Sequence, residues 1–299
     1  MHKAQQKRFD SLYRKHVNAL RRQGKADSTI DCYARAVRRI SEFFDCPVDV
    51  LTQDQLEGYF DALVKTHSWS TVKVDRNGLQ FFFKHVLKRD WQWVDIVKPP
   101  VVKTLPDVLT VKEVERLING TRELRYQTFI LTCFSMGLRI GEALSIEIGD
   151  IDSERMRLHV RGAKGRKDRY VTLPQVTLLA LRRYWVTHRH PRFLFPGGRD
   201  AEQRHQAEGF MDRGGLQKSF KAIVRDVGIH KAATVHTLRH SFGLALTDAG
   251  VSLRAVQEAM GHEDPRTTAL YTQLSSYTQT DTERRINALI KRLRIQWGE

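Results

Sequence analysis

The 299-residue chain is short of acidic residues, has few cysteines and contains no long apolar run. Cys32, Cys46 and Cys133 lack the spacing of metal ligands, and their odd number argues against a disulfide framework. No run approaches the roughly 18 apolar residues of a membrane span, and the polar N-terminus lacks the apolar stretch of a signal peptide. We therefore expect a protein of the reducing cytoplasm that has no membrane partner.

Positive charge is what the chain has in excess. Its 50 lysines and arginines face 34 acidic residues, for a net charge of +16. A basic tail would concentrate this excess, but residues 1–98 hold 18 basic and 12 acidic residues and the remainder holds 32 and 22. Charge distributed in this way favours a polyanionic partner that the whole body of the protein contacts, although many basic faces are merely solvated.

The first hundred residues are expected to be helical. Apolar residues at helical spacing predict helices over residues 3–23, 29–44, 53–64 and 70–88. Ser28 is the expected N-cap of the second helix, and Thr52 with Gln55 forms a capping-box pattern before the third. Residues 1–95 are therefore predicted to be a small helical domain. Residues 96–108 contain three prolines and few periodic apolar residues, which predicts an extended linker.

The second domain, residues 109–299, is predicted to be mainly helical with a small β-hairpin. Thr110 and Glu113 form a capping-box pattern at its start. Residues 157–160 and 169–173 are the expected strands, joined by a turn. Further helices are expected over residues 126–136, 141–146, 174–188, 216–227, 235–248, 253–260 and 265–274, with loops over 190–200 and 204–215. The chain as a whole is thus predicted to be α+β and mainly α.

Six residues of the second domain have side chains that suit chemistry at a phosphodiester. They lie in GLRIGEAL, GAKGRKDRYVTLP, HTLRHSF and MGHEDPRTTALYTQL, and they are Arg139, Lys164, His236, Arg239, His262 and Tyr271. Negative charge accumulates as a phosphodiester bond breaks, and preorganised Arg, Lys and His donors meet that charge. The phenol is a group that can attack phosphorus, so the set predicts strand cleavage through a covalent intermediate.

The arginines and one histidine are expected where helices begin. His236 and Arg239 share one face of a helix near its start, where backbone N–H groups favour an anion. Arg139 lies shortly after Gly137 at an expected helix boundary, and it can donate two N–H groups to phosphate oxygens. Glu142 either orients that guanidinium or forms an ordinary helical salt bridge. His240 lies one turn after His236, and we expect a supporting role for it.

The candidate nucleophile lies on a short helix. Asp264 and Pro265 are its expected N-cap and first residue, and Tyr271 follows two turns later, with Tyr277 as a nearby alternative. An unperturbed phenol has a pKa near about 10. A cationic pocket and a nearby base would therefore be needed to activate it.

These motifs, in this order, resemble those of the tyrosine recombinases, also called the phage-integrase family, and are nearest to the two-domain Xer-type and integron-type enzymes. The similarity is weak in the first third and strong from about Leu109 to Leu274. It implies a C-shaped clamp on DNA whose helical domain is the core-binding domain. It also implies strand exchange through a 3′-phosphotyrosine and a Holliday junction. Because such chemistry stores the bond energy, no cofactor is expected, and no acidic triad or Cys/His cluster suggests a metal.

The resemblance also assigns roles to single residues. It makes Tyr271 the nucleophile, and His236 accepts its proton or bonds a phosphate oxygen. His262 bonds the scissile phosphate, and Lys164 protonates the departing 5′ oxygen, although Ala163 stands where the family often has glycine. Further DNA contacts are expected from Arg166, Lys167, Arg169, Arg35, Arg38, Lys73 and Arg76.

The expected partner is a double-stranded DNA recombination site in the nucleoid of a prokaryotic cytoplasm. The resemblance implies a monomer or dimer on single sites and a homo-tetramer on synapsed DNA. The segment 281–297 carries Ile286, Leu289, Ile290 and Leu293 at helical spacing, and it docks either on a neighbouring protomer or on its own domain. The alternatives are a type IB topoisomerase and a DNA-binding protein that has lost catalysis. The target sequence stays open, as does the biological role: chromosome-dimer resolution, cassette exchange, or phage or transposon integration.

Overall fold

The computed structural model describes residues 1–91, 107–162, 168–262, 264–275 and 280. The chain divides into two compact units, Met1–Lys103 and Thr104–Glu299, and each is described by itself. Within the described ranges, no helix combines the length and the apolar character that crossing a bilayer requires. The expected terminal helix over 281–297 and most of the expected linker lie outside the described residues.

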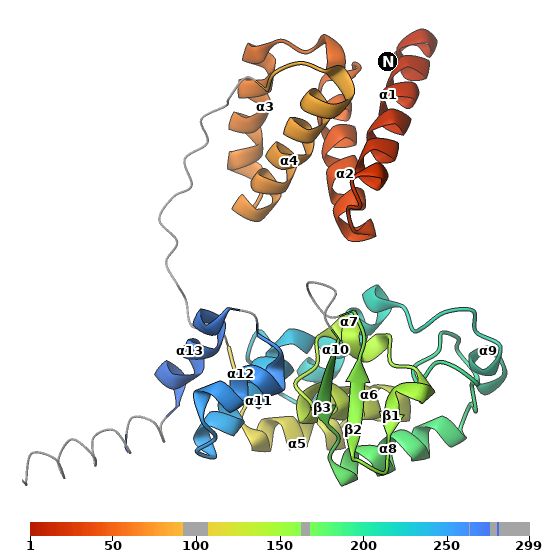
Figure 1. Ribbon diagram of the computed structural model, residues 1–299, viewed down its shortest axis with the longest axis vertical. Coiled ribbons are helices and arrows are strands. Elements are labelled where there is room, and N and C mark those ends of the chain that lie inside the picture. Colours follow the sequence, from red (N-terminus) through yellow and green to blue (C-terminus); the bar gives the residue numbers. More distant parts are fainter. Residues whose placement is uncertain (92–106, 163–167, 263, 276–279, 281–299) are drawn as a thin grey trace, which may run out of the picture. The chain divides into compact units, whose positions relative to one another are not determined.

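The N-terminal unit is helical, as predicted (Figure 1). Its elements are α1 (Lys3–Arg22), α2 (Asp27–Phe44), the 3-10 turn η1 (Val48–Val50), α3 (Gln53–Thr66), α4 (Trp69–Phe82) and the π-helical turn η2 (Phe83–Leu87). The capping box of α3 is confirmed, because the Gln55 N–H donates to Thr52 Oγ1 and the Gln55 side chain accepts from the Thr52 N–H. The predicted cap of α2 is wrong. That helix begins before Ser28, at Asp27, whose carboxylate suits the positive end of the helix dipole.

Close packing of α2 on α4 holds this unit together. Gly78 permits the approach, since a Cβ there would lie 3.0 Å from the Cβ of Ala36. Asp75, buried in α4, accepts hydrogen bonds from Arg39 (2.7 Å) and from the Tyr59 hydroxyl (2.8 Å). The buried charge is therefore paired, as burial requires. The apolar core includes Val37, Ile40, Leu56, Phe60, Leu79 and Phe82.

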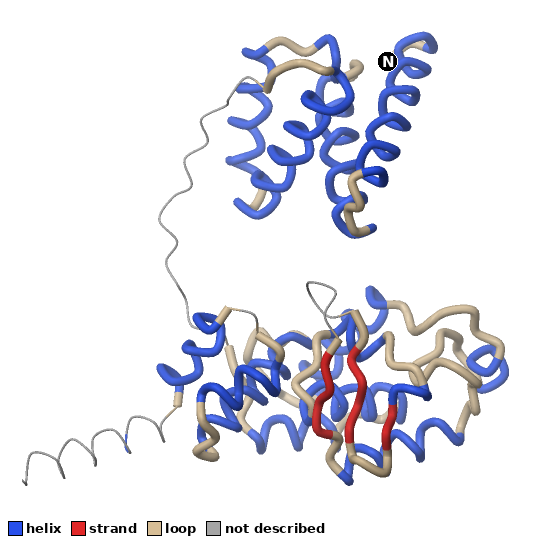
Figure 2. The backbone as a smooth tube through the Cα atoms, viewed as in Figure 1, coloured by secondary structure: helices blue, strands red, loops and turns tan. Residues whose placement is uncertain are grey.

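The C-terminal unit combines a small antiparallel sheet with helices (Figure 2). The sheet has the order β1 (Ile151–Asp152), β2 (Arg157–Val160), β3 (Arg169–Thr172). The helices are α5 (Val111–Asn119), α6 (Leu124–Ser135), α7 (Ile140–Leu144), α8 (Gln175–Val186), α9 (Ala201–His205), α10 (Arg213–Asp226), α11 (Val235–Asp248), α12 (Leu253–Met260) and α13 (Pro265–Leu274). The predicted hairpin is confirmed, with Leu158 opposite Val171. The sequence did not predict β1 or α9, which are too short to show a period.

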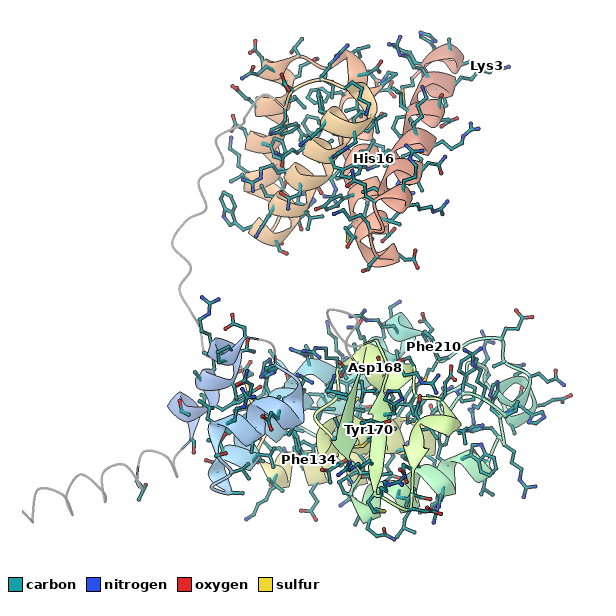
Figure 3. All side chains as sticks on the ribbon, in the orientation of Figure 1. Lys3, His16, Phe134, Asp168, Tyr170 and Phe210 are labelled. Atoms are coloured by element: carbon teal, nitrogen blue, oxygen red, sulfur yellow. The ribbon has the colours of Figure 1, made fainter. Side chains whose placement is uncertain are left out.

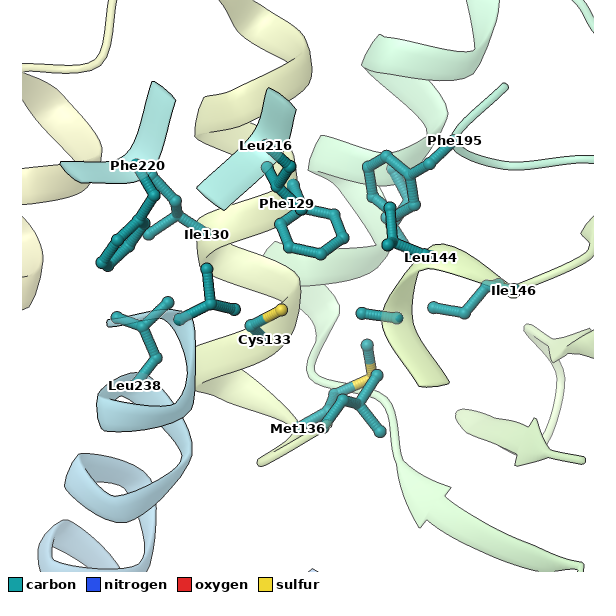
Figure 4. Close-up of a cluster of buried hydrophobic side chains, with 14 of the residues drawn as sticks. Phe129, Ile130, Cys133, Met136, Leu144, Ile146, Phe195, Leu216, Phe220 and Leu238 are labelled. Carbon is teal, nitrogen blue, oxygen red and sulfur yellow. The ribbon is translucent and has the colours of Figure 1, made fainter. Parts of the chain in front are cut away.

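The core of this unit forms around α6 (Figure 4). Phe129, Ile130 and Cys133 of α6 are fully buried. They contribute to one apolar cluster together with Leu144, Ile146, Phe195, Leu216, Phe220 and Leu238. Because Leu144 belongs to α7 and Leu238 to α11, the same core fixes both helices. The start of α7 and the start of α11 carry three of the six predicted catalytic residues: Arg139, His236 and Arg239.

Candidate active site

Side chains from four parts of the C-terminal unit meet at the candidate site. They come from the start of α7, from β3, from the first turns of α11 and from the segment that joins α12 to α13 and continues along α13. Five of the six predicted catalytic residues lie there: Arg139, His236, Arg239, His262 and Tyr271. The sixth, Lys164, lies outside the described residues, together with Arg166 and Lys167.

The ends of the segment that contains Lys164 are joined to each other. The N–H of Gly162 donates to Asp168 Oδ1 at 2.8 Å, and the His159 ring bonds Asp168 Oδ2 at 3.1 Å. Asp168 and Tyr170 mark the start of β3 in Figure 3, and the Tyr170 ring stacks on His159 with centroids 4.9 Å apart. The hairpin therefore has a defined base on both sides of residues 163–167.

Arg139 occupies the N-cap of α7, as the predicted helix boundary requires. Two residues earlier, Gly137 has φ +59°, and a Cβ there would lie 2.5 Å from the Phe242 ring. Glycine is thus the residue that allows this sharp entry into α7. The Arg139 guanidinium donates to Glu142 Oε1 (2.7 Å) and to the Gly261 carbonyl (3.3 Å). Its side chain remains 27% exposed.

Arg139 and His236 line an open cleft of about 480 Å³. Two further arginines, Arg161 and Arg213, share its wall. Sequence patterns did not single them out: Arg161 directly follows the predicted strand 157–160, and Arg213 lies in the predicted loop 204–215. Arg161 is held by Asp150 at 2.5 Å. The cleft is therefore cationic, which suits an anionic ligand.

Arg239 is buried, in contrast to Arg139. Its side chain is 1% exposed and donates to the carbonyls of Gly137 and Met260. Burial, helped by the charge of Arg139 and opposed by Glu142, lowers the pKa of Arg239 to about 10. It remains a cation at neutral pH. The two arginines bind neighbouring peptide groups: Arg239 donates to the carbonyl of Met260, and Arg139 donates to the carbonyl of the next residue, Gly261.

One buried carboxylate joins these arginines. Glu142 is 8% exposed, bonds Arg139 as the sequence suggested, and lies 3.9 Å from Arg239. We expected Arg169 among the DNA contacts, but its guanidinium binds Glu142 through both terminal nitrogens, at 2.9 and 2.8 Å. Burial alone would raise the pKa of Glu142. The hydrogen bonds from Arg169 and Arg139 outweigh burial and lower that pKa to about 2.

Tyr271 is hydrogen-bonded to a histidine. Its hydroxyl lies 3.0 Å from Nδ1 of His240, one turn along α11 from His236. Burial and the neighbouring His236 and Arg239 lower the pKa of His240 to about 4, so the ring is neutral at pH 7. In the tautomer that carries its proton on Nε2, Nδ1 accepts a hydrogen bond from the phenol. The His236 ring meets His240 edge-on, with centroids 4.6 Å apart. In the structure the tyrosine's partner is His240. The sequence analysis gave His236 either that role or a bond to a phosphate oxygen, and the second role stays a prediction.

The Tyr271 ring is enclosed. It is 0% exposed and packs in an apolar cluster with Val256 and Met260. Burial raises the pKa of Tyr271 to about 12, against the opposing effect of Arg239. A Cβ at Gly243 would lie 2.5 Å from the ring, so glycine in α11 makes the space that the ring occupies. The sequence shows this glycine in HSFGLAL, but only the structure shows its neighbour.

His262 follows the left-handed C-cap Gly261 of α12, as predicted. Its Nδ1 is hydrogen-bonded to the buried hydroxyl of Thr268 at 2.8 Å, and its ring stacks on Tyr271 with centroids 6.2 Å apart. Burial and the charges of Arg239 and Arg139 lower the pKa of His262 to about 3. Asp264 caps α13 and Pro265 begins it, which confirms the predicted start.

The residues predicted to contact DNA from the N-terminal unit have varied surroundings. Arg35, Arg38 and Lys73 are exposed, and Arg76 is partly buried. Arg35 pairs with Asp31, and the Arg38 guanidinium lies 5.7 Å from the centre of the Tyr13 ring. Their contacts with DNA stay a prediction.

Paired arginines beside a histidine-bonded tyrosine are the arrangement expected of enzymes that cut and rejoin DNA through a tyrosine. Residues 107–277 match the Phage integrase family, and residues 12–93 match the phage integrase N-terminal SAM-like domain. The chain therefore belongs to the phage integrase family, the tyrosine recombinases. The second match also agrees with the helical fold of the N-terminal unit.

Three similar proteins illustrate the family. A putative integrase/recombinase of Sinorhizobium fredii is 33% identical over 249 residues, which cover 82% of this chain and 78% of that protein. The tyrosine recombinase XerA of Pyrococcus horikoshii is 28% identical, over 85% and 86% of the two chains. The Tn1549 transposon integrase, solved in complex with transposon right end DNA, aligns with a TM-score of 0.65 at 18% identity over 91% and 98% of the two chains. This last likeness concerns the fold.

Proposed function

We propose that the chain is a site-specific DNA recombinase that uses Tyr271 to cut and rejoin DNA strands at its recombination sites. The observation that carries the proposal is the 3.0 Å contact between the Tyr271 hydroxyl and Nδ1 of His240. This pair lies beside Arg239, whose carbonyl partner Met260 directly precedes the Gly261 partner of Arg139. A nucleophile, a neutral base and two cations thus share one site.

The reaction follows from these groups. The Tyr271 oxygen forms a bond to the scissile phosphorus as the bond from phosphorus to the 5′ oxygen breaks, which leaves a 3′-phosphotyrosine. The phenol proton passes to His240 as the O–P bond forms. His240 is neutral because its pKa is about 4, and so weak a base can take the proton only then, because the phenol becomes strongly acidic once its oxygen bonds phosphorus. Lys164 supplies the proton that the 5′ oxygen needs. Attack by a 5′ hydroxyl of another strand reverses these steps, so rejoining requires no added energy source.

Two arginines bind the phosphate during this exchange. Arg139, partly exposed on the cleft, contacts non-bridging oxygens from the open side. Arg239 acts from a buried position. Its charge attracts the phosphate more strongly there, because the surrounding dielectric is low. His236 lines the same cleft. His262 has Nδ1 committed to Thr268, so its bond to phosphate comes from Nε2.

The enclosed tyrosine places a condition on the reaction. Because Tyr271 is 0% exposed, a phosphate can reach its oxygen only after the ring or α13 shifts. The pKa near 12 keeps the phenol protonated until then. DNA binding must therefore expose the Tyr271 hydroxyl and, at the same time, bring the phosphate held by Arg139 and Arg239 next to it.

A covalent adduct tests the proposal. Sequencing junctions formed beside the native locus would give the recombination site, and a nicked duplex of that site traps the intermediate because the short 5′ fragment diffuses away. The parent protein should give an adduct that migrates slowly in a denaturing gel, and Tyr271→Phe should bind the duplex normally without forming it. Tyr184→Phe is the matched control, since Tyr184 is equally buried but lies in α8. Adduct formation by Tyr271→Phe at the parental yield would contradict the assignment.

The proposal extends to assembly in the cytoplasm. Both domains, residues 1–95 and 109–299, would contact the duplex. Four protomers would join two sites, with the apolar stripe of residues 281–297 docking on a neighbour. Deleting residues 281–299 should leave single-site binding and the melting temperature nearly unchanged while the two-site complex is lost in a mobility shift. A truncated protein that unfolds would show instead that the segment packs on its own domain.

A further inference from the structure

Arg169 makes a two-pronged contact with the site's buried carboxylate. Its two terminal nitrogens donate to the two oxygens of Glu142, at 2.9 and 2.8 Å, from a side chain that is 14% exposed. Arg139 donates to the same carboxylate through its backbone N–H (3.0 Å) and its guanidinium (2.7 Å). These four bonds use the acceptor positions that a carboxylate offers.

The charges around Glu142 explain why this contact matters. Without Arg169, the carboxylate would hold its negative charge in a buried place with Arg139 beside it and Arg239 at 3.9 Å. It would then draw both guanidinium groups toward itself, because a buried charge must be paired. The same two guanidinium groups are needed at the phosphate. Because Arg169 neutralises Glu142, the charges of Arg139 and Arg239 remain available for the phosphate.

Arg169 also touches the segment that follows α12. Gly261 has φ +60°, and a Cβ there would lie 2.7 Å from both Cδ and Nε of Arg169. The Arg169 side chain therefore lies directly against the residue whose carbonyl binds Arg139 and whose successor is His262. One side chain of β3 thus contacts both parts of the site that hold Arg139 in place.

We propose, on the basis of the proposed function, that Arg169 is a positioning residue for strand cleavage: it neutralises Glu142 and supports Gly261, and so sets Arg139 and Arg239 for the scissile phosphate. It touches neither the phosphate nor the reacting atoms. Replacing Arg169 should therefore slow cleavage without lowering the affinity for the duplex. Its effect should also depend on the negative charge of Glu142.

The test compares Arg169→Met, Glu142→Gln and the double variant in the full-length chain. Cleavage rate is measured at saturating concentration of the nicked duplex, and duplex affinity is measured separately. Arg169→Met should lose up to about 100-fold in rate, the scale for a catalytic group misplaced by roughly 1 Å, with affinity unchanged. The double variant should cleave faster than the product of the two single losses predicts, since a neutral glutamine no longer draws the arginines inward. Arg157→Met removes the same charge from the exposed end of β2 and should cleave at the parental rate.

A second variant covers the case in which Arg169→Met does not fold. Arg169→Lys keeps the charge but loses the forked contact, so it should fold and cleave several-fold more slowly at unchanged affinity. Parental cleavage by Arg169→Lys, strictly multiplicative losses in the double variant, or a loss of affinity with a normal saturated rate would each overturn the inference. The last result would return Arg169 to the DNA contacts. Failure of the parent to form any adduct would instead contradict the proposed function.

Discussion

Gly243 controls the position of the candidate nucleophile. It lies within α11, and a Cβ there would be 2.5 Å from Tyr271 Cε2, 2.7 Å from its Cζ and 2.6 Å from the sulfur of Met260. Non-bonded carbon atoms prefer a separation of about 3.5–4.0 Å. Gly243→Ala therefore requires the Tyr271 ring to move by roughly 1 Å. Met260 packs with the ring in one apolar cluster and the His262 ring stacks on it, so a shift of this size changes the 3.0 Å bond to His240.

Two opposing effects set the stability of this variant. Alanine in a helix interior is favoured over glycine by about 1 kcal/mol. Overpacking a well-packed core costs about 1–3 kcal/mol. We expect a net loss of about 0–2 kcal/mol in the free energy of unfolding, a change that a folded protein tolerates. The effect on cleavage should be larger, on the order of 100-fold, because a nucleophile displaced by about 1 Å loses its alignment.

The assay measures adduct formation on a nicked duplex together with thermal melting. Gly58→Ala is the matched control, because Gly58 also lies inside a helix, α3, but nothing lies within 4 Å of its added Cβ. The control should melt slightly higher and cleave normally. Parental cleavage by Gly243→Ala, with a melting temperature raised like that of Gly58→Ala, would refute the packing of Tyr271 against α11.

Three further predictions concern other groups. Arg139→Ala and Arg239→Ala should each cut the cleavage rate by about 100- to 1,000-fold, as for loss of one oxyanion donor, while duplex affinity changes little; parallel losses would make them binding contacts only. Lys164→Ala should cleave normal DNA poorly but a 5′-bridging phosphorothiolate well, since that leaving group needs no proton, and equal defects would place the acid elsewhere. Burial lowers the folded-state pKa of His16 from 6.5 to about 4. The unfolded chain therefore binds more protons than the folded chain below pH 6.5. The free energy of unfolding should fall by up to about 3 kcal/mol as the pH drops from 6.5 to 4. Hydrogen exchange over residues 1–91 should show this loss in the parent and much less of it in His16→Leu.

Local signals in the sequence predicted most of the fold. The capping boxes at Thr52 and Thr110 depend on neighbours three residues apart, and both are present in the structure. The helices α11, α12 and α13 begin and end where periodicity and caps predict. Ser28 failed as a cap because α2 begins at Asp27, two residues before the predicted start, and Ala26 is its N-cap. Strand β1 has two residues, too few for alternation to show.

The motifs grouped Arg139, Arg239 and Tyr271 for chemical reasons, and the structure brings these side chains together. Their catalytic roles stay a prediction, and their contacts were not predictable from the sequence. The bond between Tyr271 and His240 spans 31 residues, and it exists because α13 packs on α11. The pairing of Arg169 with Glu142 likewise joins a strand to a helix 27 residues earlier. Contacts of this kind depend on tertiary packing, which local sequence patterns do not contain.

The identity of the tyrosine that bonds to DNA tests the central claim most directly. Trypsin should release residues 267–284 as one peptide, which contains both Tyr271 and Tyr277. After the trapped adduct is digested with trypsin and nuclease, fragmentation of this peptide by mass spectrometry should place a 3′-linked nucleotide on Tyr271. A nucleotide found on Tyr277, or on a residue of any other peptide, would contradict the account.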